Sequence, residues 1–131
     1  MPQAQANQNE NVQSILIVDD DEMILEILSK GFEMYGLDVV IADNGLDGWE
    51  LFKKNPVKIV LTDISMPGLD GIELSRRIRN ASPNTTIALM TGGDAYIAAE
   101  LLNDRTAKYL FTKPFAISDV CKSLIPDKQS A

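Results

Sequence analysis

Short apolar runs alternate with helical patterns along most of the chain. Residues 15–18 read Ile-Leu-Ile-Val and residues 59–61 read Ile-Val-Leu, with no polar position inside either run. Such runs are typical of strands that are covered on both faces. Apolar residues spaced three or four apart follow each of them, as on one face of a helix. The predicted strands are 14–18, 37–42, 57–62, 85–90 and 107–112, and helical patterns cover 24–32, 46–52, 72–78, 94–103 and 117–125.

Five strands that alternate with five helices predict an α/β domain with a doubly wound parallel sheet and helices on both faces. In the first helical pattern we expect Ile24, Ile27, Leu28 and Phe32 to face one core. Residues 1–13 are polar and without periodicity, which predicts a disordered N-terminal tail. The predicted domain then covers residues 14–126, and residues 127–131 form a short C-terminal tail.

The charged and reactive residues exclude several classes of function. The chain has 131 residues, a net charge of −7 and no histidine. The charge argues against nucleic acid or a membrane surface as a partner. The lack of histidine excludes His-based zinc sites and Ser-His or Cys-His nucleophiles. Cys121 is the only cysteine, so no intramolecular disulfide forms, and with no secretory signal this favours the cytoplasm.

Polar residues gather where the predicted strands end. Asp19, Asp20 and Asp21 follow the first strand, and Asp63 follows the third. Thr91 follows the fourth strand and Lys113 follows the fifth. Parallel strands end at one edge of the sheet, so these side chains converge there if the first strand lies next to the third.

Carboxylates that converge must be offset by positive charge. Two unit charges about 4 Å apart repel by roughly 4 kcal/mol at an effective dielectric near 20. Lys113 supplies one positive charge, and a divalent cation would supply two. Ligands that are all oxygen favour Mg²⁺, or Mn²⁺, over zinc. An open Mg²⁺ beside a lysine and a hydroxyl suits a phosphoryl group.

Four motifs in this order resemble the receiver domain of bacterial two-component response regulators. They are residues 18–21, 61–71, 90–92 and 112–115, which read Val-Asp-Asp-Asp, Leu-Thr-Asp-Ile-Ser-Met-Pro-Gly-Leu-Asp-Gly, Met-Thr-Gly and Thr-Lys-Pro-Phe. The resemblance covers about residues 15–125. It implies a flavodoxin-like sheet with strand order 2-1-3-4-5, and a stand-alone receiver similar to the chemotaxis regulator.

The resemblance also implies a role for each matching residue. Asp63 would accept a phosphoryl group from a histidine kinase or a histidine phosphotransfer protein. Mg²⁺ would be held by Asp63, by Asp20, by Asp19 mainly through water, and by the backbone carbonyl of Ser65. The phosphoryl group would be bound by Lys113 and Thr91, with Gly92 beside them, and Pro114 would follow a cis peptide bond. Phosphorylation would then change contacts with a target protein at the fourth helix, fifth strand and fifth helix.

The chain departs from the family pattern at the switch position, and two further positions bear on loss of the phosphoryl group. The family often has an aromatic switch residue three positions before the lysine, but here it is Leu110. Alternation along the strand places the neighbouring Tyr109 and Phe111 on the other face from Leu110. Ser65 and Gly93 stand where the family tunes loss of the phosphoryl group. Neither is acidic or carries an amide, which predicts slow self-dephosphorylation.

Two alternatives remain at the level of sequence. The chain could be a receiver-like binding module that is not phosphorylated, for which Leu110 is the support. It could also be a phosphatase of the haloacid dehalogenase type, because Asp19 and Asp21 have that family's Asp-x-Asp spacing. Met23 stands where those enzymes carry Thr or Val. We therefore expect a phosphoacceptor and not an enzyme that turns over a separate substrate.

Overall fold

The computed structural model describes residues 13–93 and 95–125. Its parallel sheet has the order β2-β1-β3-β4-β5, which confirms the predicted fold. The strands are β1 (Ser14–Val18), β2 (Asp38–Ala42), β3 (Ile59–Asp63), β4 (Thr86–Thr91) and β5 (Tyr109–Thr112). The helices are α2 (Glu22–Met34), α3 (Gly45–Lys54), α4 (Gly71–Ala81), α5 (Ala95–Asn103) and α6 (Ile117–Leu124).

The predicted tails fall almost wholly on residues 1–12 and 126–131, which lie outside the described residues. Gln13 is described, and its carbonyl accepts a hydrogen bond from the N–H of Asp38 (2.9 Å). This bond joins the residue before β1 to the start of β2.

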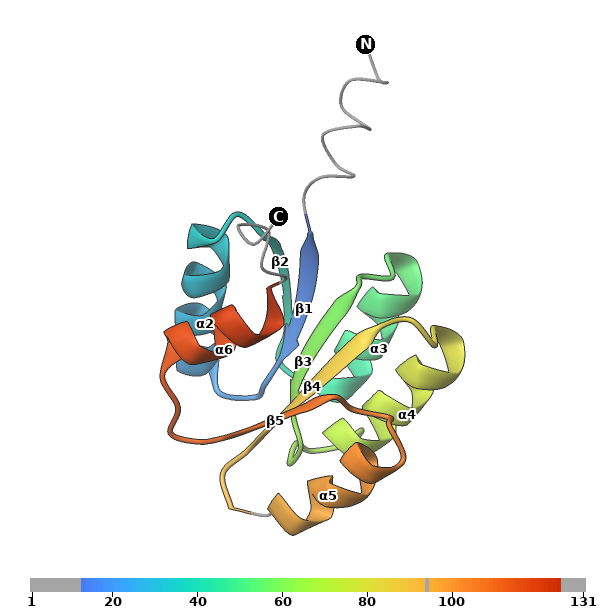
Figure 1. Ribbon diagram of the computed structural model, residues 1–131. Coiled ribbons are helices and arrows are strands. Elements are labelled where there is room, and N and C mark those ends of the chain that lie inside the picture. Colours follow the sequence, from blue (N-terminus) through green and yellow to red (C-terminus); the bar gives the residue numbers. More distant parts are fainter. Residues whose placement is uncertain (1–12, 94, 126–131) are drawn as a thin grey trace, which may run out of the picture.

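The sheet separates two layers of helices. Helices α2 and α6 lie on one side of it, and α3, α4 and α5 lie on the other (Figure 1). In β1, Ile15 and Ile17 pack toward α2 and α6, while Leu16 and Val18 pack in the opposite core. Both sets are buried. The uninterrupted apolar run therefore reflects a strand with no solvent-facing side.

The core face of α2 differs from the prediction at one position. Leu28 and Phe32 are fully buried, as expected, but Ile27 is 44% exposed. Leu25 is buried in its place, and Ile24 is half-buried against the same core. The buried set therefore follows the spacing 25, 28 and 32, three and four residues apart, which Ile27 does not share.

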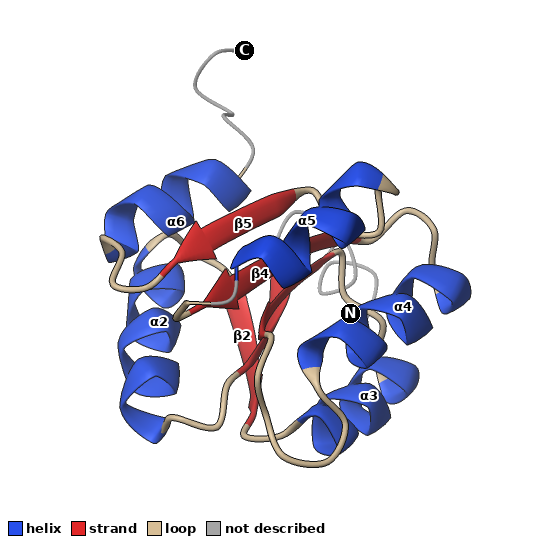
Figure 2. Ribbon diagram, turned by 90° about the horizontal axis from the view of Figure 1, so that it is seen from below, coloured by secondary structure: helices blue, strands red, loops and turns tan. Residues whose placement is uncertain are grey.

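The sheet order brings the ends of β1 and β3 together. Val18 is in register with Thr62, so Asp19 and Asp63 follow on adjacent strands. In Figure 1 strands β1 and β3 run downward, and Figure 2 looks from below onto the edge at which they end. Among the described residues, no helix combines the length and the apolar character needed to cross a membrane.

Candidate functional site at the carboxyl edge of the sheet

The three consecutive aspartates after β1 have three different environments. Asp19 is fully buried, and its Oδ1 accepts a hydrogen bond from the N–H of Asp21 (2.9 Å). Asp20 is exposed. Asp21 caps α2, because its side chain accepts from the N–H groups of Met23 and Ile24. Only Asp19 and Asp20 are thus available to a common site, while Asp21 stabilises the helix.

Asp63 lies at the end of the buried strand β3. Its side chain is 11% exposed, and its Oδ1 accepts a hydrogen bond from the N–H of Ile64 (2.9 Å). The hydroxyl of Thr62 donates to the backbone carbonyl of Asp63 (2.9 Å). The N–H of Ile64 also lies 3.0 Å from the carbonyl of Met90 on β4. The strand end is therefore held by β4 and by bonds from its own neighbouring residues.

The loop after Asp63 closes tightly because of a glycine. The N–H of Gly71 donates to the carbonyl of Ile64 (2.8 Å), which joins the start of α4 to the end of β3. A Cβ at position 71 would lie 2.0 Å from the carbonyl oxygen of Asp63. No side chain fits this approach, so Gly71 allows the helix to begin directly beside the candidate phosphoacceptor.

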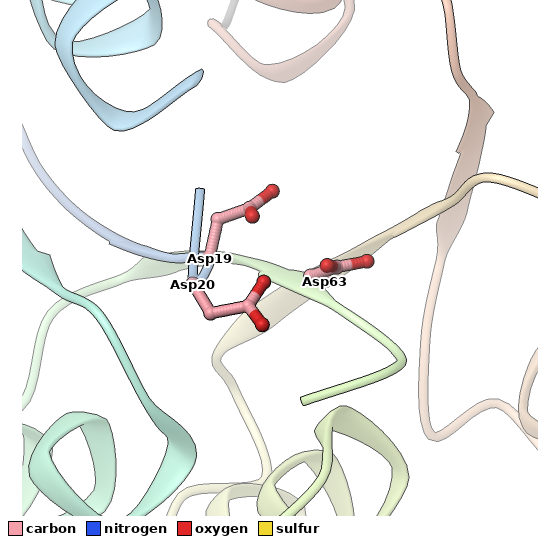
Figure 3. A group of neighbouring side chains, drawn as sticks. All are labelled: Asp19, Asp20 and Asp63. Atoms are coloured by element: carbon pink, nitrogen blue, oxygen red, sulfur yellow. The ribbon is translucent and has the colours of Figure 1, made fainter. Parts of the chain in front are cut away.

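Three carboxyl groups meet at this edge (Figure 3). An oxygen from each of Asp19, Asp20 and Asp63 lies within 4.8 Å of the others. These oxygens come from two adjacent strand ends, as the strand order requires. A cluster made only of carboxylate oxygens fits a hard divalent cation that keeps part of its water shell.

Lys113 reaches the cluster from the end of β5. Its Nζ lies 2.8 Å from Oδ2 of Asp19 and 3.5 Å from Oδ2 of Asp63. The backbone N–H of Lys113 donates to the carbonyl of Thr91 (2.7 Å), and the peptide bond between Lys113 and Pro114 is cis. One ammonium group therefore bridges the two buried carboxylates.

The ionisation of these groups reflects burial and charge. Burial and the neighbouring charge of Asp19 raise the pKa of Asp63, and Lys113 opposes this only in part. Burial lowers the pKa of Lys113, but the hydrogen bond and charge of Asp19, together with Asp63, outweigh it and raise the pKa overall. The lysine thus stays charged, and the site still favours additional positive charge.

The remaining predicted site residues lie around this cluster. Thr91 is buried at the end of β4, and its Oγ1 accepts from the N–H of Gly93 (3.3 Å). Gly92 and Ser65 are exposed in the loops that follow β4 and β3. The carbonyl of Ser65 as a metal ligand remains a prediction.

Leu110 lies on the other face of the sheet from its aromatic neighbours. It packs against the core beneath α3, α4 and α5, whereas Tyr109 and Phe111 pack on the side of α2 and α6. The rings of Tyr109 and Phe111 are stacked with centroids 6.0 Å apart. The alternation predicted for this strand is therefore correct, and an aliphatic side chain occupies the switch position.

Sequence reasoning missed the backbone donor that orients Asp63. The N–H of Ile64 has no side-chain signature, because any residue other than proline supplies it. The tight approach of Gly71 was also missed. The only sequence signal for this close approach was the glycine itself, which is the last residue of the motif at 61–71.

The family comparison agrees with this geometry. The model of the response regulator receiver domain matches residues 15–125. The chain belongs to the response regulator receiver domain family. Receiver domains are phosphoacceptor signalling domains of two-component systems.

Relatives and solved structures support the same assignment. The chain is 37% identical to the response regulator receiver protein CpdR of Brucella abortus, over 84% of this chain and 92% of that protein. It is 35% identical to the transcriptional regulatory protein YkoG of Bacillus subtilis, over 81% of this chain and 46% of that protein. The CheY-like receiver domain protein of Methanospirillum hungatei has a TM-score of 0.82 at 26% identity, covering 86% of this chain and 90% of that one.

Proposed function

We propose that the chain is a phosphorylation-dependent signalling switch that accepts a phosphoryl group on Asp63. The observation that carries the proposal is the position of Asp63, a largely buried carboxylate within 4.8 Å of Asp19 and Asp20 oxygens and 3.5 Å from the ammonium of Lys113. An oxygen of Asp63 attacks the phosphorus of a donor phosphohistidine. The P–N bond breaks, and its electron pair stays on the imidazole nitrogen of the donor.

The residues around Asp63 supply what this transfer needs. Asp19, Asp20 and Asp63, with the carbonyl of Ser65, would hold Mg²⁺, which draws negative charge from the transferring group when it is bound. Lys113 holds a phosphoryl oxygen, which requires it to shift from its bridging position between the two buried carboxylates. Thr91, at the next strand end, donates its hydroxyl to another phosphoryl oxygen.

The donor and the target are proteins. A histidine kinase or a histidine phosphotransfer protein supplies the phosphoryl group, since the chain has no histidine. The acyl phosphate adds negative charge and acceptor oxygens next to Thr91, which lies before α5, and next to Lys113, which directly follows β5. The surface formed by α5, β5 and α6 is therefore the one that changes for a target protein.

The geometry disfavours the phosphatase alternative. That chemistry would use Asp19 as the nucleophile, but Asp19 is fully buried and its oxygens bond Lys113 and the N–H of Asp21. Asp21, the second acid of the motif, caps α2. Asp63 is more accessible than Asp19, since 8% of its surface is exposed and none of that of Asp19 is.

The test is intact mass after incubation with acetyl phosphate and Mg²⁺. We expect one added phosphoryl group in the wild type, its loss on chelation of the metal, and no adduct on Asp63→Asn. Asp70→Asn is the matched control, because Asp70 caps α4 and asparagine caps as well. An adduct that survives in Asp63→Asn would refute the assignment. No adduct in the wild type, with Mg²⁺ shown to bind, would favour the binding-module alternative.

A further inference from the structure

The outer edge of β2 forms the base of an open groove. The groove has a volume of about 860 Å³ and lies between α2 and α3. Figure 2 shows these two helices on either side of β2. Leu25 from α2, Leu51 from α3 and Ile41 from β2 give it apolar walls and floor. Ile41 is 47% exposed, which leaves apolar surface uncovered at the sheet edge.

The backbone of β2 has unused hydrogen-bonding groups on this side. In a parallel pair, every second residue bonds the same neighbour through both its N–H and its C=O. The N–H of Asp38 donates to Gln13, and the C=O of Ala42 accepts from Asp19, so residues 38, 40 and 42 bond toward β1. Val39 and Ile41 therefore direct their N–H and C=O groups outward. No described strand pairs with this edge.

The groove is strongly acidic. Six carboxylates and two lysines line it. Glu26 pairs with Lys30 (3.3 Å), and Glu50 pairs with Lys53 (3.2 Å), which is not among the lining residues. Glu22 and Glu33 have no ion-pair partner among the described residues. The acidic lining residues are Glu22, Glu26, Glu33, Asp43, Asp47 and Glu50. The groove thus combines an apolar floor, open backbone groups and excess negative charge.

We propose that this groove binds a basic, extended segment of a partner protein, which adds to β2 as a further strand. The N–H and C=O groups of Val39 and Ile41 pair with its backbone, as in other complexes that extend a sheet edge. Its apolar side chains cover Ile41, and its lysines or arginines meet the carboxylates of α2 and α3.

Charge selects this occupant over two others. A second copy of the chain would bring the same acidic groove edge to edge, and the like charges would repel. Residues 1–12 of this chain contain no lysine or arginine and one glutamate, so they offer no complementary charge. A basic segment of another protein satisfies both the backbone and the charge.

The groove is separate from the proposed phosphorylation site. None of Asp19, Asp20, Asp63 or Lys113 lines it. Binding here does not depend on phosphorylation of Asp63, and the Asp63→Asn variant should bind the same segment as the wild type.

The test uses a peptide of alternating lysine and valine with blocked ends, and a glutamate-valine peptide as its charge control. Backbone amide NMR of the full chain should show shifts and slowed hydrogen exchange at Val39 and Ile41 with the lysine peptide only. In the free protein these two amides should exchange fast. If these two amides are protected in the free protein at every protein concentration, the chain's own residues cover the edge. If their protection grows with protein concentration, a second copy covers it. Either result overturns the proposal.

Paired variants separate a groove from general attraction to an acidic protein. Glu22→Gln combined with Glu33→Gln, at the two groove carboxylates without an ion-pair partner among the described residues, should weaken binding of the lysine peptide about fivefold, the scale of two exposed charge contacts. Glu73→Gln combined with Glu100→Gln removes the same charge from α4 and α5 and should change affinity by less than about twofold. Equal weakening by both pairs, or shifts centred away from β2, would contradict a site on this edge.

Discussion

Burial of Asp63 beside Asp19 destabilises the charged form of the Asp63 side chain, which shifts its pKa. Burial and the charge of Asp19 raise the pKa of Asp63 above its ordinary value of 3.8. The folded protein therefore holds this proton more strongly than the unfolded chain does. The contribution of Asp63 to stability is largest below its ordinary pKa and is lost as the pH rises through the folded value.

The variant Asp63→Asn should for this reason be more stable than the wild type at pH 7 without metal. The gain should be on the order of 1 kcal/mol, which is the repulsion of two charges about 4 Å apart even in bulk water. Urea unfolding in the presence of a chelator measures it, and the difference should shrink near pH 3. A variant that is less stable at pH 7 would mean that the ion pair with Lys113 outweighs the repulsion.

Cys121 is a packing residue, and its chemistry should show this. It is fully buried in the core beneath α2 and α6, and burial raises the pKa of its thiol to about 11. Since the thiolate is the reactive form, iodoacetamide at pH 8 should leave the native protein unmodified and alkylate it rapidly in guanidinium chloride. Intact mass gives both results. Rapid alkylation under native conditions would show that α6 opens readily.

Among the elements, β3 and α4 meet directly beside Asp63, where a Cβ at Gly71 would lie 2.0 Å from its carbonyl oxygen. The Cβ of Gly71→Ala would overlap the carbonyl of Asp63, so β3 and α4 must separate. We expect a loss of about 1–3 kcal/mol in the free energy of unfolding, the usual cost of overpacking. The rate of phosphorylation by acetyl phosphate should fall with it.

Gly93→Ala is the matched control for this prediction. Nothing lies within 4 Å of a Cβ at position 93, so stability should change by less than about 0.5 kcal/mol. Equal losses in the two variants would mean that backbone flexibility, and not the contact with Asp63, explains the effect.

Element types and order follow from the sequence, and so does the first residue of β1, but the other four strands begin one or two residues later than predicted. The apolar runs predict strands from Val57 and Ala107, whereas β3 begins at Ile59 and β5 at Tyr109. Both earlier residues are buried, and the N–H of Ala107 bonds to Leu101 in α5 rather than to a strand. A run of apolar residues indicates which residues are buried. In these two segments burial begins two residues before the hydrogen-bonded strand does.

At the scale of the molecule, the site follows from the sheet order, while its internal arrangement does not. Parallel strands and the adjacency of β1 and β3 are enough to bring Asp19, Asp20 and Asp63 to one edge. The family resemblance assigned Asp19 and Asp20 to the site, but the polar pattern alone could not show which of three consecutive aspartates is buried with Lys113 and which caps α2. That division depends on how the chain turns after Val18, and a run of identical residues carries no signal about it.

The whole domain should gain stability from Mg²⁺, because the cation binds the folded cluster and has no such cluster in the unfolded chain. At a concentration tenfold above its dissociation constant, the gain is about 1.4 kcal/mol. Asp20→Asn should abolish most of it, since Asp20 supplies an exposed carboxylate to the cluster. Asp38→Asn removes an exposed carboxylate at the opposite end of β2 and should leave it intact. Thermal unfolding with and without Mg²⁺ measures the effect. An equal gain in all three proteins would place the cation elsewhere on this acidic surface, and the three carboxylates would then need another source of positive charge.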